Sequence, residues 1–278
     1  MKGDLLFLLL ILTVPLLVQG PFTLAIAVTA LVFSILSLSW FFLDDRAGWV
    51  SLAHSVPFGL AAYAVAINPT LLIPAFLLCL VIFVLISLLG RERFVFASFI
   101  LTILFWYISH YLTLKGAGGE EGFSFPSISA FHAYMLAVFV LLLSLTALIA
   151  ISKSALGLRI AAVRDDEIAA RSVGIHSFQI RVIAFATSIF VAFLAGICYV
   201  VYFGHASPEV FSAEIALLPF IAGLIAGKRW VSPLAGSYAI VIVSIALGSV
   251  LPSAHLLLYS VVLILSPKLR RWWNAEGY

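Results

Sequence analysis

The sequence predicts an all-α fold, a polytopic membrane bundle of about ten transmembrane helices in a single domain covering residues 1–278. Of the 278 residues, 64% are apolar and 10% are charged, whereas a soluble domain is about 45–50% apolar and about 25% charged. The mean hydropathy is +1.22. The charged residues are bunched, and the runs between them are long enough for one or two crossings at about 20 residues each. A water-soluble globular protein is therefore excluded.

Ten apolar segments, separated by turn residues and charges, are the predicted spans. They are 4–19, 22–43, 48–67, 71–89, 94–114, 130–151, 178–203, 214–227, 233–250 and 253–267. The breaks are turn and loop sequences, namely Gln19-Gly20-Pro21, Asp44-Asp45-Arg46, Asn68-Pro69, Gly90-Arg91-Glu92-Arg93, 115–129, 152–181, 204–213, Lys228-Arg229 and Leu251-Pro252. The segments 214–227 and 253–267 are short, and either can be a partial or tilted crossing, which leaves a range of eight to ten spans. The first span also resembles a signal peptide, but Pro21 is a poor residue after a cleavage site, so we expect a retained helix.

The distribution of basic residues orients the chain. If the N-terminus lies in the cytoplasm, fourteen of the fifteen Lys and Arg residues fall on the cytoplasmic side, and only Lys115 lies outside. Basic residues in short loops mark the cytoplasmic side of a membrane protein. We therefore expect both termini to be cytoplasmic.

Several kinds of protein lack support in the sequence. The twelve acidic residues all lie in loops or at the ends of predicted spans, so the membrane interior has no acidic ion-coupling group. His54, His110 and His132 lie within spans, where a hydrogen-bonded structural role is the common one. Cys79 and Cys198 lie in apolar runs and indicate no redox site. The sequence has no zinc-binding pair, nucleophile elbow or Gly-rich phosphate loop. We expect no catalytic residue, no metal and no cofactor in this chain, so any ATP is used by partner subunits.

The segment 152–181 is the long polar stretch on the cytoplasmic side. It predicts a short helix, Asp165–Val173, whose acidic first residues suit the positive end of the helix dipole. Glu167 and Arg171 are four residues apart and can pair, and Gly174 can end the helix in a left-handed conformation. Such a short helix needs packing to be stable. Its apolar face suits a groove in another protein, and an amphipathic connector on the membrane surface is an equal alternative. That face consists of Ile168, Ala169, Ala170 and Val173.

The run from Gly157 to Ile175 resembles the cytoplasmic loop of the branched-chain amino acid ABC transporter permeases, the Leu/Ile/Val high-affinity uptake family. In that family the pattern reads approximately G-x-x-L/I-x-A-x-R-D/E-x-E-x-A-A-x-x-x-G-I. The resemblance implies that 152–181 is a cytoplasmic coupling loop on which an ATP-binding subunit docks. The residues that it assigns to docking are Gly157, Arg159, Arg164, Asp165, Asp166, Glu167, Ala169, Ala170 and Gly174.

Two further stretches are similar to the same family, and a third departs from it. Residues 48–63 resemble its G-x-x-S-L-G-H-x-x-F-x-G-x-G-A-Y helix, although Pro57 breaks the spacing. Residues 194–211 follow its A-G-x-x-Y and G-x-x-S-P-x-x-F pattern. The family's Gly-rich segment is replaced at 223–236, where Lys228 and Arg229 are inserted. We expect the inner gate or a partner contact to differ there.

The segment 48–67 is the predicted lining of the translocation path. Pro57 removes a backbone donor and favours a kinked or unwound helix, and unpaired backbone in a membrane needs protein or a water-filled cavity around it. The residues proposed for the path are Gly48, Ser51, His54, Phe58, Gly59 and Tyr63. The alternative is a close helix contact made by the small residues Gly48, Ser51, Ala53 and Gly59.

The resemblance implies a function and a set of partners. The function is that of a permease subunit of an ABC importer for branched-chain or related amino acids, multi-pass in the cytoplasmic (inner) membrane of a prokaryote. The partners are two ABC ATPase subunits, a second homologous permease subunit, an extracytoplasmic solute-binding protein and the lipid bilayer, with no nucleic acid. The alternative is a secondary carrier or channel for a small neutral solute such as urea or an amide, and nothing in the spans selects the solute.

Overall fold

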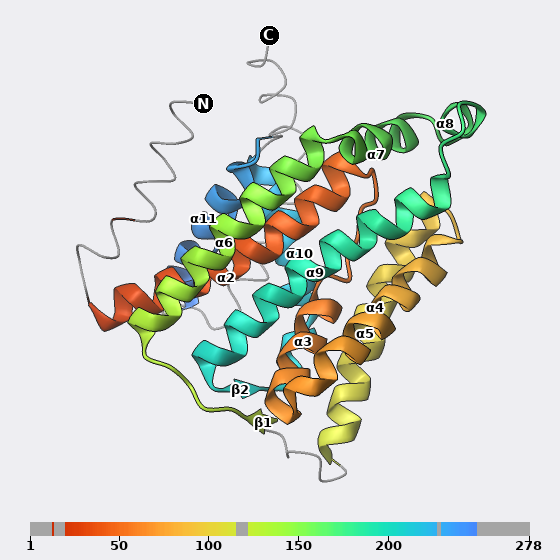
Figure 1. The fold of residues 1–278 in the computed structure, drawn as a ribbon. Coiled ribbons are helices and arrows are strands. Elements are labelled where there is room, and N and C mark those ends of the chain that lie inside the picture. The colour runs from red at the N-terminus through yellow and green to blue at the C-terminus, as the bar shows by residue number, and fades with distance from the viewer. Residues whose placement is uncertain (1–12, 14–19, 115–121, 227–228, 249–278) are drawn as a thin grey trace.

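A computed structural model describes residues 13, 20–114, 122–226 and 229–248, which form a bundle of helices (Figure 1). The helices are α2 (Pro21–Phe41), α3 (Ser55–Ile67), α4 (Leu72–Ser87), α5 (Arg91–Leu114), α6 (Ala130–Lys153), α7 (Ala155–Asp165), α8 (Glu167–Ser172), α9 (Ser177–Phe203), α10 (Ala213–Ala226) and α11 (Ser232–Gly248). A π-helical turn, Phe42–Arg46, follows α2, and 3-10 turns lie at Pro69–Leu71 and Pro208–Phe211. The predicted span 4–19 apart from Thr13, the predicted span 253–267 and both termini lie outside the described residues.

The helical class predicted for the chain is confirmed. One departure from an all-α fold is a short antiparallel pair in which β1 (Phe123–Ser124) hydrogen bonds to β2 (His205–Ala206). Among the described residues, five helices are long and apolar enough to cross a membrane, and they agree with five of the predicted spans. These spans are Phe22–Arg46, Pro69–Ser87, Arg91–Tyr111, Ala130–Lys153 and Ser177–Phe203. The chain is a multi-pass membrane protein.

The short helices α7 and α8 lie across one end of the bundle (Figure 1). At this end α2 and α6 finish and α5 and α9 begin, so it carries Arg46, Arg91, Lys153 and Arg181 together with the charges of α7 and α8. We term it the basic end. Its composition is typical of a cytoplasmic face.

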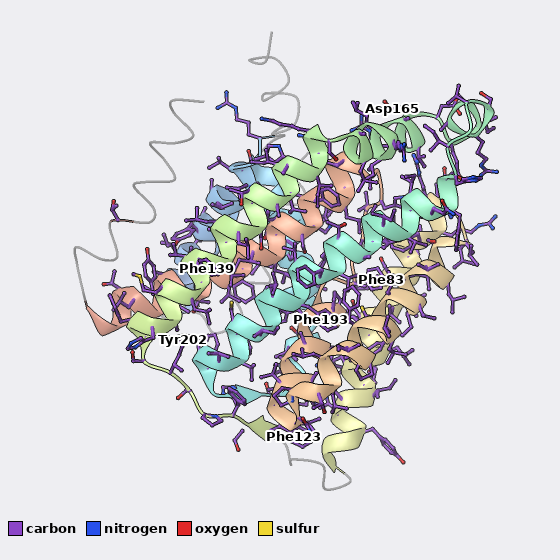
Figure 2. All side chains as sticks on the ribbon, viewed as in Figure 1. Phe83, Phe123, Phe139, Asp165, Phe193 and Tyr202 are labelled. Atoms are coloured by element: carbon purple, nitrogen blue, oxygen red, sulfur yellow. The ribbon has the colours of Figure 1, made fainter. Side chains whose placement is uncertain are left out.

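The core of the bundle is built around α2. In α2, 83% of the central span is buried, against 17% in α4, whose apolar side chains mostly face outward as lipid-facing residues do. Helices α6, α9, α10 and α11 all contact α2. Figure 2 shows Phe83 and Phe193 within the bundle, whereas Phe139 on α6 is exposed.

The predicted span 48–67 is wrong over its first part, because the helix begins only at Ser55. Residues 49–53 have no helical structure, and Pro57 lies in the first turn of α3, where its missing N–H needs no partner. The unwound backbone is hydrogen bonded by α5: Ser98 Oγ accepts from Leu52 N at 2.9 Å, and Thr102 Oγ1 donates to Leu52 O at 2.9 Å. The break is therefore satisfied by a neighbouring helix and is not a kink at Pro57.

The depth of this break follows from its partners on α5. At 1.5 Å per residue, Ser98 and Thr102 lie about 10–16 Å along α5 from Arg91, which is roughly half of a ~30 Å hydrocarbon layer. Helix α3 then runs from this level away from the basic end (Figure 1). Helix α3 therefore spans only the half of the membrane that is farther from the basic end.

Helix α10 is a second broken crossing, which begins beside the first. The 3-10 turn Pro208–Phe211 precedes it, and Ser55 Oγ, at the start of α3, donates to Phe211 O at 3.5 Å. Helix α10 runs from there toward the basic end, where Trp230 packs on Phe41 with ring centroids 5.4 Å apart. The predicted span 214–227 is thus a partial one. Two discontinuous helices that start inside the bundle are a recurrent feature of transporters.

Candidate functional site

The candidate coupling site consists of α7 and α8, which we term the platform. The predicted helix Asp165–Val173 is present as α8 but begins at Glu167, because Asp166 is its N-cap and accepts from the backbone N of Ile168 at 2.8 Å and of Ala169 at 3.0 Å. Gly174 has φ +85°, as expected of a left-handed helix end. The sequence reading missed α7. The N-cap Ser154 and the apolar spacing of Leu156, Ile160 and Val163 were the available signals.

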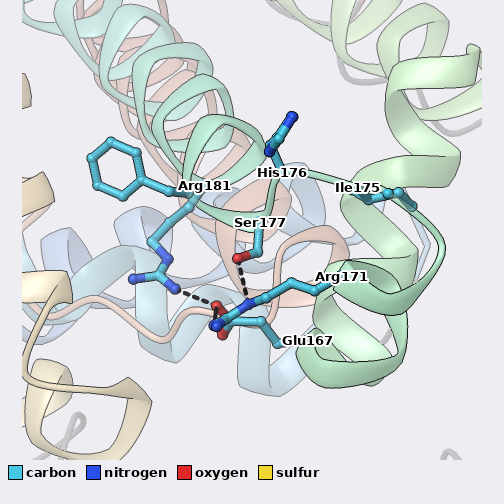
Figure 3. Close-up of a pocket in the computed structure, with 8 residues that line it drawn as sticks. Glu167, Arg171, Ile175, His176, Ser177 and Arg181 are labelled. Carbon is cyan, nitrogen blue, oxygen red and sulfur yellow. Dashed lines mark hydrogen bonds and ion pairs between the residues drawn. The ribbon is translucent and has the colours of Figure 1, made fainter.

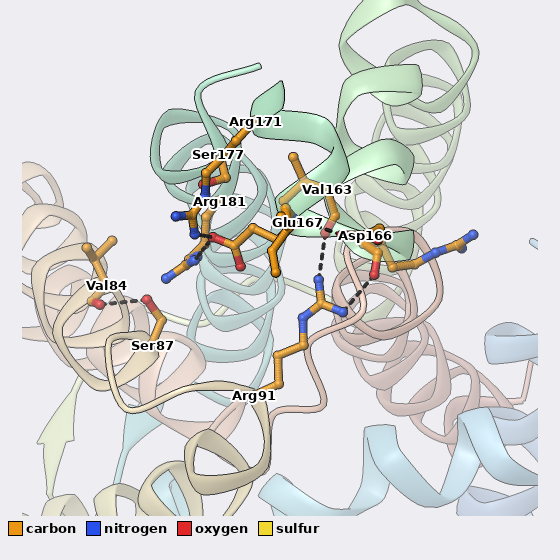
Figure 4. Close-up of polar contacts among 11 residues, drawn as sticks. Val84, Ser87, Arg91, Val163, Asp166, Glu167, Arg171, Ser177 and Arg181 are labelled. Carbon is orange, nitrogen blue, oxygen red and sulfur yellow. Dashed lines mark hydrogen bonds and ion pairs between the residues drawn. The ribbon is translucent and has the colours of Figure 1, made fainter. Parts of the chain in front are cut away.

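Two arginines attach α7 to the membrane helices. The Arg91 guanidinium, from the start of α5, donates to Arg164 O at 2.7 Å and to Val163 O at 2.8 Å, which are carbonyls at the C-terminal end of α7 (Figure 4). The Arg164 side chain in turn donates to Asp45 O at 2.6 Å, in the turn that follows α2. Cations suit the negative end of a helix dipole. The end of α7 is therefore bonded to α2 and α5.

Glu167 attaches α8 to α9. Its carboxylate forms ion pairs with Arg171 and, at 2.9 Å, with Arg181 on α9, while Arg171 Nε donates to Ser177 Oγ at 3.0 Å (Figure 3). Partial burial acts to raise the pKa of Glu167, but the hydrogen bonds from Arg171 and Ser177 and the charges of Arg181 and Arg171 outweigh it, and the pKa is lowered. Glu167 is therefore an ionised anchor.

Glu167→Gln is expected to loosen α8. A hydrogen bond to a charged group contributes about 1.5 kcal/mol or more, so we expect the amides of α8 to exchange about tenfold faster with solvent. Because the folded protein favours the carboxylate, this contribution is full above the ordinary pKa of glutamate and is lost as the pH falls through the lowered value. Hydrogen exchange of α8 in the purified protein, followed over this pH range, measures the contribution of Glu167.

Asp165→Asn is the matched control for this change. Asp165 is exposed and pairs at 2.8 Å with Arg164, and exposed ion pairs contribute little. We expect less than about a twofold change in the exchange of α8. Equal effects of the two substitutions would contradict the role of Glu167 as an anchor.

Large apolar side chains are exposed on α8 and at its C-terminal end. Ile168 is 81% exposed and Val173 is 74% exposed, and both belong to the face predicted from the sequence. A pocket of about 490 Å³ lies beside them. It is lined by Glu167, Arg171, Gly174, Ile175, His176, Ser177, Phe178 and Arg181 (Figure 3).

The nine residues assigned to docking by resemblance divide into three groups. Arg159, Asp165, Ala169 and Gly174 are exposed, and Asp166, also exposed, is the N-cap of α8. Arg164 and Glu167 are half-buried in the attachments described above, whereas Gly157 and Ala170 are buried within the chain. The sequence reading did not single out the exposed Leu158 and Phe178 or the attachment through Arg91.

The residues proposed for the translocation path follow the unwound segment and α3 through the bundle. Gly48 has φ +72° and lies against the Arg164 side chain at the basic end. Ser51 is buried, and its carbonyl accepts from Trp40 Nε1 at 2.8 Å. His54 is buried, and its Nε2 lies 3.1 Å from Ser188 Oγ on α9. Ser51 and His54 therefore hydrogen bond within the chain.

The other three proposed residues lie on α3. Phe58 is buried with its ring centroid 5.2 Å from that of Tyr199, and the Tyr63 ring packs at a tilt against Phe211, with centroids 5.4 Å apart. Gly59 lies directly under the Phe211 ring, where a Cβ would collide. Gly59 thus makes the close small-residue contact that was the alternative reading, although its partner is an aromatic ring of the 3-10 turn.

Metal-binding chemistry has no support among the described residues, where no group of three His, Cys, Asp or Glu side chains could hold an ion. The described part of the chain therefore presents two features: a platform at the basic end, and two broken crossings in the interior.

Comparison with known proteins gives one finding. The family described as branched-chain amino acid transport system / permease component matches residues 22–267. No curated protein and no solved structure matches the chain. The matched region contains all the described membrane helices except the first residue of α2. The chain belongs to the family of permease components of branched-chain amino acid transport systems.

Proposed function

We propose that this permease is the membrane subunit of an ABC importer that carries branched-chain or related amino acids across the cytoplasmic membrane of a prokaryote. The observation that carries the proposal is the platform. Helix α8 exposes Ile168, and its C-cap Val173 is also exposed, although Glu167 bonds the helix to α9. Apolar side chains that the described residues leave this exposed suit a groove in another protein. The resemblance of residues 157–175 to the coupling loop of the family makes an ATPase subunit that partner.

The attachments of the platform provide a physical means of coupling. ATP binding brings two ATPase subunits together, and each docked platform moves with its ATPase. Because Arg164, Arg91 and Glu167 bond the platform to α2, α5 and α9, its displacement acts on three membrane helices. A ligand shifts a conformational equilibrium only by its different affinity for the two states. Docking at the platform supplies that difference.

The remaining partners follow from the same proposal. A second homologous permease completes the pathway, and an extracytoplasmic solute-binding protein selects the solute. The polar groups along the unwound segment are neutral, and Ser51 and His54 hydrogen bond within the chain. Such groups provide weak interactions for passage and no strong site for one amino acid.

Reconstitution tests the proposed function. The permease is expressed in its native host, purified by a tag on this chain together with the proteins bound to it, and placed in liposomes with the solute-binding protein outside. We expect an ATPase to co-purify, and uptake of radiolabelled leucine, isoleucine or valine to require ATP inside the liposomes. Uptake that needs no ATP and responds to a sodium or proton gradient would instead identify a secondary carrier. Passive flux of a neutral solute would identify a channel.

A further inference from the structure

Trp49 lies between the platform and the broken crossing. It follows Gly48, whose left-handed backbone turns the chain into the bundle, and it begins the unwound segment that leads to α3. The side chain is only 4% exposed. Its ring centroid lies 5.2 Å from Phe94 on α5 and 5.5 Å from Phe185 on α9, both in edge-on geometry. The ring is thus fixed between two membrane helices.

Two guanidinium groups lie over the Trp49 ring. The Cζ atom of Arg181 is 5.0 Å from the ring centroid, and that of Arg91 is 5.8 Å away. Both distances fall within the range of cation–π attraction, which is strongest for tryptophan and increases when the groups are shielded from water. Trp49 therefore contacts two cations at once.

Both arginines also bond to the platform. Arg91 donates to two carbonyls at the end of α7, and Arg181 pairs with Glu167 on α8 (Figure 4). Each arginine has one set of contacts on the platform and another on the Trp49 ring. A displacement of the platform must therefore move the arginines over Trp49 or break their bonds to α7 and α8.

We propose that Trp49 is a positioning residue that couples the platform to the unwound segment and, through it, to α3. The inference rests on the proposed function and adds the route by which docking reaches the interior. Leu52 is bonded to α5 on both its N–H and its C=O, so the stretch between Trp49 and the start of α3 at Ser55 moves together with α5, the helix that carries Arg91. A contiguous set of packed and bonded groups carries energetic coupling between separated sites.

Trp49→Leu tests this inference in the reconstituted importer. Leucine keeps an apolar side chain in the buried position but removes the aromatic face, and Trp49→Phe keeps a smaller, weaker one. The measured quantity is the number of solute molecules transported per ATP hydrolysed. We expect Trp49→Leu to lower this ratio at least about tenfold while the ATPase still co-purifies and hydrolyses ATP. Trp49→Phe is expected to lower it about threefold.

Trp106→Leu is the matched control. Trp106 lies on α5 away from the platform, and its ring contacts Tyr107 and His110. We expect its ratio to stay at the wild-type value. A purely structural role for Trp49 would reduce the amount of folded complex, so transport and ATP hydrolysis would fall together and the ratio would be unchanged. That result would overturn the inference.

A second measurement does not involve ATP or a partner. Glu167→Ala disturbs the platform, and hydrogen exchange in α3 reports whether the disturbance reaches the interior of the purified chain. We expect Glu167→Ala to increase exchange in α3 when Trp49 is present. In the Trp49→Leu background, the same substitution should change exchange in α3 little. The same increase in both backgrounds would refute the role of Trp49, whatever energy source drives transport. Uptake without ATP, by contrast, would refute the proposed function.

Discussion

Replacing Ile168 and Val173 together by aspartate is expected to abolish docking of the ATPase subunit without unfolding the permease. Both side chains are mostly exposed in the isolated chain, at 81% and 74%, so the change costs the fold little. In the proposed complex the same side chains are buried, and burying one such side chain contributes about 1.5–3 kcal/mol. Losing both, and burying charge in their place, is expected to weaken docking at least about 100-fold.

The measurement is the affinity of the purified permease for its ATPase, together with the amount that co-purifies. The double change Leu88→Asp with Leu89→Asp is the matched control, because these side chains are 62% and 48% exposed at the same end of the bundle, in the turn between α4 and α5. It introduces the same charge away from the platform, and docking should be unchanged. Normal docking of the double variant would contradict the placement of the ATPase on α8.

The sequence predicts the long helices well because their signal is local. Charge-free runs set the positions of α2, α4, α5, α6 and α9, and the turn residues between them set the boundaries. The sequence signals for the end of α8 and for its ion pair are local as well. Gly174 takes the left-handed conformation that its type and position predict, and Glu167 pairs with Arg171 four residues away.

The unwound segment before α3 could not be predicted in the same way. Hydropathy reports burial in the membrane, and residues 48–54 contain no Lys, Arg, Asp or Glu, so the sequence joins them to the apolar run of α3. What permits the break is a pair of hydrogen bonds between Leu52 and the side chains of Ser98 and Thr102, which are about 50 positions away in the sequence. Pro57 was the visible local signal, but it lies inside the first turn of α3 and does not cause the break.

The attachments of the platform are distant in sequence as well. Arg91 reaches carbonyl groups of Val163 and Arg164, and Arg181 pairs with Glu167 across the turn that precedes α9. A run of basic residues predicts a cytoplasmic face, but it does not tell which arginines bond inside the protein and which face a partner. The docking residues assigned by resemblance therefore include buried ones, such as Gly157 and Ala170.

Gly196→Leu is expected to prevent formation of the native bundle. Gly196 lies on α9 at the closest approach of that helix to α3, where a Cβ atom would collide with the carbonyl oxygen of Phe58 and lie 3.0 Å from Cβ of Ala61. The colliding atom belongs to the backbone, so no rotation of a side chain relieves it. Helix α3 would have to move away from α9, and with it the 3-10 turn before α10, which contacts α3 at Ser55.

The size series at this position separates packing from helix propensity. Gly196→Ala improves helix propensity by about 1 kcal/mol, yet overpacking costs about 1–3 kcal/mol, so we expect a lower Tm. The larger side chain in Gly196→Leu is expected to lower the free energy of unfolding by more than its total of about 5–15 kcal/mol. The protein would then be misfolded and aggregated. Thermal stability in detergent and size-exclusion elution are measured for both variants.

Ala147→Leu is the control, because it adds a leucine to an exposed position on α6. It should leave the Tm and the elution volume unchanged. If Gly196→Leu also elutes and melts like the wild type, α3 does not pack on α9 as described, and the two broken crossings lose the support that places their starts together.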